Sequence, residues 1–190
     1  VGIWAIRLGS YLYIRNMGHP EDARYSKMRS KYGNVGLFFI NYLIQAILIA
    51  IISLPLQSVL SAIELELNII SWLSAIMALA GIIIEALSDK QLKAFKKDTI
   101  NNGKVMSLGL WNYSRHPNYF GNSLFWWGIS IYSLSLTFEL IVLVSPIVMT
   151  YFLLKVSGVS MLETQIKHTK EGYKEYIDTT SAFIILPKKK

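Results

Sequence analysis

The chain has 190 residues, of which 53% are hydrophobic and 16% charged, and its mean hydropathy is +0.38. A soluble domain carries about 25% charged residues, and disorder requires low hydrophobicity, so this composition excludes both classes. The chain has no cysteine, which excludes a disulfide scaffold and a cysteine-ligated metal site. The net charge of +7 taken alone is compatible with nucleic-acid binding, but the distribution of the charges along the chain favours another explanation.

The first fifteen residues are mostly apolar, with Arg7 and Arg15 as their only charged side chains, and we interpret them as the end of a transmembrane helix. Because the chain starts with Val1, inside this helix, we expect it to be truncated at its N-terminus. On a helix Arg7 would lie about 12 Å deeper in the bilayer than Arg15.

Four longer stretches are long and apolar enough to cross a membrane, which takes about 20 residues. They are residues 36–54, 67–87, 118–136 and 138–156, the last with Pro146 as a predicted kink. None alternates between apolar and polar residues, so helices are favoured over barrel strands. We therefore predict an all-α, polytopic transmembrane bundle of about five spans, forming one membrane-embedded domain over residues 1–190.

The charges alternate between the segments that join these spans. Lys and Arg are concentrated in residues 15–31, in residues 88–115 and in the tail from Lys155. Residues 55–66 and the turn near Thr137 carry only acidic charges. The positive-inside rule places the basic segments in the cytoplasm, so we expect a multi-pass membrane protein whose basic segments lie on the cytoplasmic side. Topology thus accounts for the +7, and we predict no nucleic-acid partner.

The C-terminal tail, residues 159–190, is predicted to be cytoplasmic. Its first part, from Val159 to Asp178, places apolar residues among charges at helical spacing. This pattern is typical of an amphipathic helix at the membrane surface.

Two carboxylates occur where a membrane protein rarely tolerates them. Glu85 lies in the last turn of its predicted span, and Asp89 follows at i+4 on the same helix face. Such groups usually mark a site, and Glu85 should face the bundle interior with a partner; Arg7 is one candidate. The structural alternative is a Glu85 that snorkels to the interface. Lys93 and Lys96 follow on the next turns, and for them the positive-inside bias alone is the structural alternative to a site.

The densest polar and aromatic cluster runs from Gly109 to Asn122. Pro117 fits the first turn of a helix, so Arg115 and His116 would lie just outside the N-terminus, where an anion is favoured. Asn118 and Tyr119 supply neutral donors one turn inside. A capped helix with an aromatic belt is the structural alternative. With three widely separated histidines, a metal site is not expected.

The segment Arg115 to Gly121, with the sequence RHPNYFG, resembles a motif shared by a membrane-enzyme superfamily. That group includes steroid 5-alpha-reductases, sterol C14 and C7 reductases, and isoprenylcysteine carboxyl methyltransferases. Other segments are similar to a bacterial branch that groups with the steroid 5-alpha-reductase C-terminal domain. They are residues 4–8, 21–25, 85–91, 173–176 and 180–183. The resemblance covers nearly the whole chain and implies a bundle of about seven membrane helices. The bacterial branch also implies that the protein lies in the cytoplasmic membrane of a bacterium.

In the reductases of this group NADPH enters from the cytoplasmic side and reaches the lipid substrate inside the bundle. The resemblance implies that Glu85 and Asp89 hold the adenosine part, that Lys93 and Lys96 are basic contacts, and that Asn118 lies beside the nicotinamide. The group commonly has Glu after the motif glycine, where this chain has Asn122. Its early-helix tyrosine corresponds to Trp4, with Tyr11 two turns further on. The candidate catalytic residues are Tyr11 and Asn122. The remaining predicted cofactor-binding residues are Arg115, His116, Tyr119, Glu163, Tyr173 and Tyr176.

Three functions from different classes follow. The first is an NADPH-dependent membrane oxidoreductase that reduces a carbon–carbon double bond of a steroid-like or other lipid. The second is an S-adenosylmethionine-dependent methyltransferase of the isoprenylcysteine carboxyl or phospholipid type. The third is a non-catalytic lipid-binding membrane protein. The six Lys and Arg of residues 88–115 favour NADPH, because it carries several phosphate charges. The expected partners are the bilayer and a lipid substrate.

Overall fold

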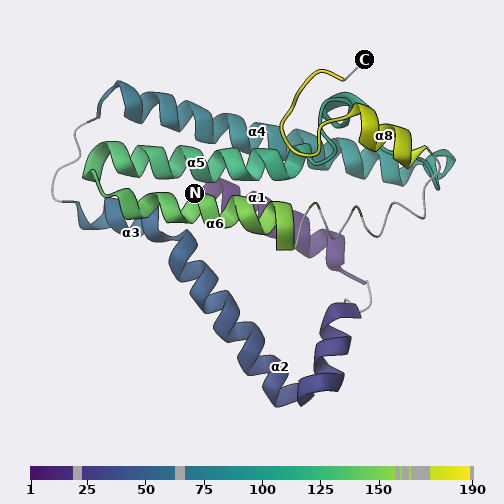
Figure 1. Ribbon diagram of the computed structural model, residues 1–190, viewed down its shortest axis with the longest axis horizontal. Coiled ribbons are helices and arrows are strands. Elements are labelled where there is room, and N and C mark those ends of the chain that lie inside the picture. The colour runs from purple at the N-terminus through teal and green to yellow at the C-terminus, as the bar shows by residue number, and fades with distance from the viewer. Residues whose placement is uncertain (19–22, 63–66, 157–158, 160–162, 164–171, 189–190) are drawn as a thin grey trace. The chain divides into compact units, whose positions relative to one another are not determined.

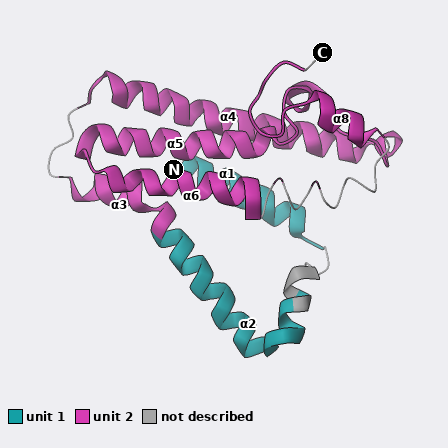
Figure 2. Cartoon of the chain, viewed as in Figure 1, with its two compact units in different colours: residues 1–50 teal, residues 51–190 magenta. Residues whose placement is uncertain are grey.

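The computed structural model describes the chain except residues 19–22, 63–66, 157–158, 160–162, 164–171 and 189–190. Helices form all the regular structure of the described part, which contains no strand, so the predicted all-helical class is confirmed (Figure 1). Residues 1–50 and residues 51–190 form two compact units, coloured separately in Figure 2. The predicted single membrane-embedded domain stays a prediction.

The first unit contains α1, Gly2–Asn16, and most of α2, Ala23–Ile52. Helix α2 is interrupted at Gly33, whose φ of 69° is a conformation that only glycine adopts without a Cβ penalty. The predicted span over residues 36–54 thus ends at Ile52. Pro55 lies in the first turn of α3, Leu54–Ser61, where its missing N–H costs nothing.

Helix α4, Ile69–Lys97, begins at a reciprocal cap. The Ser71 backbone N–H donates to the Asn68 side chain at 3.0 Å, and the Asn68 backbone N–H donates to Ser71 Oγ at 3.3 Å. Its 29 residues correspond to about 43 Å, more than the roughly 30 Å of a hydrocarbon core. The turns after Ser88 therefore extend beyond the core when Ile69 lies at the opposite boundary.

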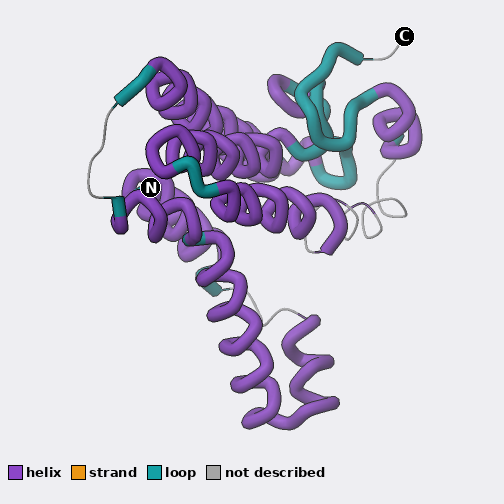
Figure 3. The backbone as a smooth tube through the Cα atoms, turned by 60° about the vertical axis from the view of Figure 1, so that its left-hand side comes forward, coloured by secondary structure: helices purple, strands orange, loops and turns teal. Residues whose placement is uncertain are grey.

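Helix α5, Pro117–Thr137, starts at the predicted proline and ends at Phe138, which is left-handed with a φ of 55°. It lies alongside α4, as Figures 1 and 3 both show. The two backbones nearly touch at glycines. A Cβ on Gly121 would lie 2.6 Å from Glu85 N, and a Cβ on Gly128 would lie 2.6 Å from Ala78 N. This close seam fixes which residues of α4 face α5.

The predicted span over residues 138–156 is not one continuous helix. It consists of the 3-10 turn η3, Leu140–Leu143, helix α6, Val144–Tyr151, and the π-helical turn η4, Phe152–Val156. Pro146 lies in the first turn of α6, so it does not kink the helix as predicted. Thr150 on α6 contacts α5, since its hydroxyl lies 2.7 Å from Ser123 Oγ and accepts from Trp127 Nε1 at 3.2 Å.

Between α4 and α5 the chain forms two 3-10 turns, η1, Thr99–Asn101, and η2, Gly109–Asn112. Of the predicted amphipathic helix from Val159 to Asp178, most residues lie outside the described ones. Its end is observed as α8, Tyr173–Thr179.

Two helical segments of the described part, Met28–Ile52 and α4, are long and apolar enough to cross a bilayer, which indicates membrane association. Helix α5, with 21 residues, is not one of these two segments. The five-span topology and the cytoplasmic position of the tail stay predictions.

Candidate functional site

Arg115 joins the N-terminal end of α5 to the C-terminal tail. Its Nε donates to Glu163 Oε1 at 2.8 Å and its Nη2 to Glu163 Oε2 at 3.3 Å. Its Nη1 donates to the carbonyls of Ile177 at 2.8 Å and Thr180 at 2.7 Å. The residue is only 9% exposed. The planar fork of guanidinium donors is therefore occupied by the protein itself in this structure.

Backbone contacts complete the attachment of the tail. Arg115 N donates to Ser181 O at 2.8 Å, and Ser114 Oγ donates to Phe183 O at 2.7 Å. The Tyr176 hydroxyl donates to Trp111 O, and Trp111 Nε1 donates to Ser88 O on α4 at 3.1 Å. The tail is thus connected through Trp111 to α4 as well as to α5.

His116 belongs to the same ionic cluster. Its Nε2 lies 3.3 Å from Glu163 Oε1 and donates to it when protonated. Its ring stacks on Tyr119, with centroids 5.4 Å apart and planes 4° apart. We call Arg115, His116 and Glu163 the tail cluster.

The tail cluster holds Glu163 ionised. Burial alone raises the pKa of this carboxyl, but hydrogen bonds from His116 and Arg115 and their charges outweigh burial, so the pKa lies below its ordinary 4.5. Burial, followed by the charge of Glu163, raises the pKa of Tyr173 to about 12. Burial also raises the pKa of Tyr176. Both phenols are therefore neutral at pH 7.

The lowered pKa of Glu163 predicts that docking of the tail is sensitive to acid. A lowered folded-state pKa means that Glu163 contributes stability above its unfolded pKa and loses it as pH falls through the folded value. The chain has no native cysteine, so a dye on Asp178→Cys can report docking of α8. We expect a reversible signal change below about pH 4.5. The same titration with Glu163→Gln should be flat in that window, and an unchanged midpoint would contradict this role of Glu163.

A second polar group lies between α4 and α5. Asn122 Nδ2 donates to Glu85 Oε1 at 3.1 Å, and Asn118 Nδ2 donates to Asp89 Oδ1 at 3.3 Å. We call these four residues the carboxylate–amide ladder. Glu85 and Asp89 are only 4% and 5% exposed, which confirms that Glu85 faces the interior beside an amide near the motif, that of Asn122.

The ladder has unused acceptors. The Oδ1 atoms of Asn118 and Asn122 are buried and have no hydrogen-bond partner among the described residues. A buried carbonyl oxygen without a donor costs free energy. The two oxygens are therefore able to accept hydrogen bonds from N–H or O–H groups of a ligand.

The remaining predicted site residues lie in different places. Lys93 and Lys96 are exposed on the last turns of α4, at i+4 and i+7 from Asp89 and thus on its face of the helix. Tyr173 and Tyr176 are buried on α8. Tyr11 is on α1, in the other compact unit, and the structure places it only within that unit.

Sequence reasoning missed the roles of Ser114 and Trp111 and the seam between α4 and α5. The seam has a signal in the sequence, because small residues recur at spacings of three and four. On α4 the buried small residues are Ser71, Ser74, Ala78, Gly81 and Ser88, and the other buried residues are Glu85 and Asp89. Such a stripe is typical of close helix packing in membranes.

The fold and the two polar groups define an all-helical, membrane-associated protein with a polar site where one end of α5 meets α4. Among the described residues no group of three or more His, Cys, Asp or Glu could hold a metal ion. Residues 1–180 match a family described as "Protein of unknown function (DUF1295)", and the chain belongs to that family. No curated protein and no solved structure matches the chain.

Proposed function

We propose that the chain is an NADPH-dependent membrane oxidoreductase that reduces a carbon–carbon double bond of a steroid-like or other lipid. The observation that carries the proposal is the carboxylate–amide ladder, with its two unpartnered amide oxygens, beside the basic end of α4. The RHPNYFG motif supplies Asn118, and Asn122 directly follows it; the resemblance of this motif to that of steroid 5-alpha-reductases supports the same assignment.

The residues present fit the chemistry of this cofactor. Asn118 Oδ1 and Asn122 Oδ1 can accept the N–H groups of a carboxamide, and the carboxylates can accept ribose hydroxyls or an adenine amine. Lys93 and Lys96 lie on the adjoining face to hold phosphates. Arg115 donates to Glu163 here, so it binds the phosphates only when Glu163 releases it, and otherwise it positions the tail.

Each part of the chain then has a task. NADPH, when bound, supplies the hydride. Glu85 and Asp89 orient the bound group through hydrogen bonds, and Asn122 fixes it from α5. The buried side chains of Phe125 and Trp126 help to exclude water from the seam. Tyr11 is our candidate donor of the proton that completes reduction of the double bond.

One observation favours a second candidate, a methyltransferase that uses S-adenosylmethionine. Glu85 and Asp89 are buried carboxylates, and Glu163 already neutralises Arg115. A site so rich in negative charge also suits the sulfonium and ammonium groups of that cofactor.

Ligand titration separates the two candidates. Purified chain in nanodiscs should bind NADPH, and a Lys93→Gln/Lys96→Gln variant should bind it roughly tenfold more weakly, because phosphate contacts are charge-assisted. Lys90→Gln is the matched control, since Lys90 lies about 100° around α4 from Asp89. Binding of S-adenosylmethionine with no NADPH affinity at about millimolar concentration would establish the methyltransferase instead.

Topology gives a further prediction. Ser58 Oγ donates to Thr137 Oγ1 at 2.9 Å, so the ends of α3 and α5 lie together, whereas Asn102 follows the opposite end of α4. Single cysteines at Ser61 and Thr137 should react with an impermeant maleimide on intact cells, and one at Asn102 should not. Labelling at Asn102 would reverse the proposed orientation.

A further inference from the structure

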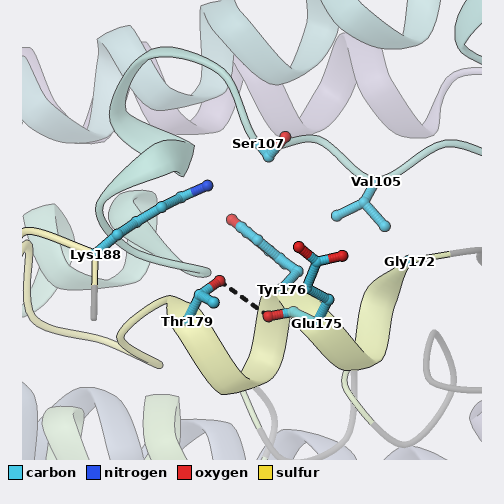
Figure 4. Close-up of a pocket in the computed structure, with 7 residues that line it drawn as sticks. All are labelled: Val105, Ser107, Gly172, Glu175, Tyr176, Thr179 and Lys188. Atoms are coloured by element: carbon cyan, nitrogen blue, oxygen red, sulfur yellow. Dashed lines mark hydrogen bonds between the residues drawn. The ribbon is translucent and has the colours of Figure 1, made fainter. Parts of the chain in front are cut away.

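A small polar pocket lies between the loop that precedes η2 and the C-terminal tail (Figure 4). Its volume is about 240 Å³, and neither the tail cluster nor the ladder contributes to it. Val105 and Ser107 line it from the loop, and Glu175, Tyr176 and Lys188 line it from the tail. The pocket therefore needs an explanation that the proposed reaction does not give.

The pocket carries one charge of each sign. Figure 4 shows the Lys188 ammonium and the Glu175 carboxylate on either side of the Tyr176 ring. These two described side chains form no salt bridge with each other. An aromatic face between an ammonium and a carboxylate suits a ligand that has an anionic group and a cationic group a few bonds apart.

The contacts of Tyr176 fix the level of the pocket along α4. Its hydroxyl donates to Trp111 O, and Trp111 Nε1 donates to Ser88 O. Ser88 lies about 28 Å along α4 from Ile69, which is close to the roughly 30 Å thickness of a hydrocarbon core. Tryptophan side chains are enriched at this boundary. When α4 spans the bilayer, the pocket thus opens at the level of the lipid headgroups.

We propose that the pocket binds the headgroup of a zwitterionic phospholipid of the phosphatidylethanolamine type. The Lys188 ammonium and the Ser107 hydroxyl hold the phosphate, the Glu175 carboxylate accepts the ethanolamine ammonium, and Val105 contacts the glycerol carbons. The inference rests on membrane embedding and is independent of the cofactor, so NADPH binding and lipid binding can fail separately.

The test is lipid binding to the full chain in detergent, measured by native mass spectrometry. We expect phosphatidylethanolamine to bind about threefold to tenfold more tightly than phosphatidylglycerol, and Glu175→Gln to abolish this preference. Lys188→Gln should weaken both lipids. Asp178→Asn and Lys174→Gln are the matched controls, because they remove exposed charges of α8 that do not line the pocket.

Three results would overturn the proposal. Equal binding of the two lipids by the unmodified chain excludes a zwitterion site. Equal losses in the control variants reduce the effect to general surface charge. Soluble phosphoethanolamine that competes as strongly as the lipid identifies a site for a free metabolite. All four substituted residues are exposed, so the variants are expected to fold.

Discussion

Replacing Arg115 by methionine should release the C-terminal tail and lower the free energy of unfolding by about 3–5 kcal/mol. The substitution leaves Glu163 without its ionic partner and the carbonyls of Ile177 and Thr180 without their donor. Urea unfolding in mild detergent measures the stability, and a dye on Asp178→Cys measures the docking of α8.

Two controls make this result specific. Lys174→Met removes an exposed charge from the same helix and should change stability by less than about 0.5 kcal/mol. Arg115→Lys keeps the charge but loses the planar fork of donors. Its free energy of unfolding should therefore lie between those of Arg115→Met and Lys174→Met. A stable Arg115→Met protein with a docked tail would show that the tail is held by its backbone contacts alone.

The sequence alone could not distinguish two roles for Arg115, which are contact with a ligand phosphate and attachment of the C-terminal tail. A basic residue beside a helix N-terminus predicts an anion, and the structure supplies that anion from the chain itself, as Glu163. Loss of NADPH binding in an Arg115 variant therefore counts as a phosphate contact only when the dye on α8 reports a docked tail.

Local patterns predicted the parts of the site that depend on a single helix. Pro117 starts α5 because its ring fits a first turn, and Glu85 and Asp89 face the same neighbour because they are one turn apart. Interior placement of Glu85 followed from the cost of a carboxylate in a membrane.

Contacts between segments that lie far apart in the sequence could not be predicted from local patterns. Arg115 and Glu163 are separated by 48 residues, and no periodicity specifies that pair. The break at Gly33 requires a positive φ that composition does not reveal. Residues 140–154 carry no charged side chain, so hydropathy could not distinguish a continuous helix from the succession of η3, α6 and η4.

A substitution in the seam between α4 and α5 is the second change from which we expect a large loss of stability. Gly121→Val should lower the free energy of unfolding by about 3 kcal/mol or more, the upper part of the range for overpacked cores. A Cβ at this position would lie 2.6 Å from Glu85 N and 2.7 Å from Gly81 O. These are backbone atoms of a helix, so no side-chain rotation can relieve the clash, and the helices must separate.

Separation of α4 and α5 would also break the carboxylate–amide ladder. Asn122, the residue after Gly121, donates to Glu85 across the seam at 3.1 Å. Cofactor affinity and stability should therefore fall together in the Gly121→Val variant.

Even Gly121→Ala should lower the midpoint of thermal unfolding. Gly9→Ala is the matched control, since it lies inside helix α1 and its added Cβ meets no described atom within 4 Å. That alanine should instead stabilise its helix by about 0.5–1 kcal/mol. Equal unfolding midpoints for the two alanine variants would mean that α4 and α5 do not pack through Gly121.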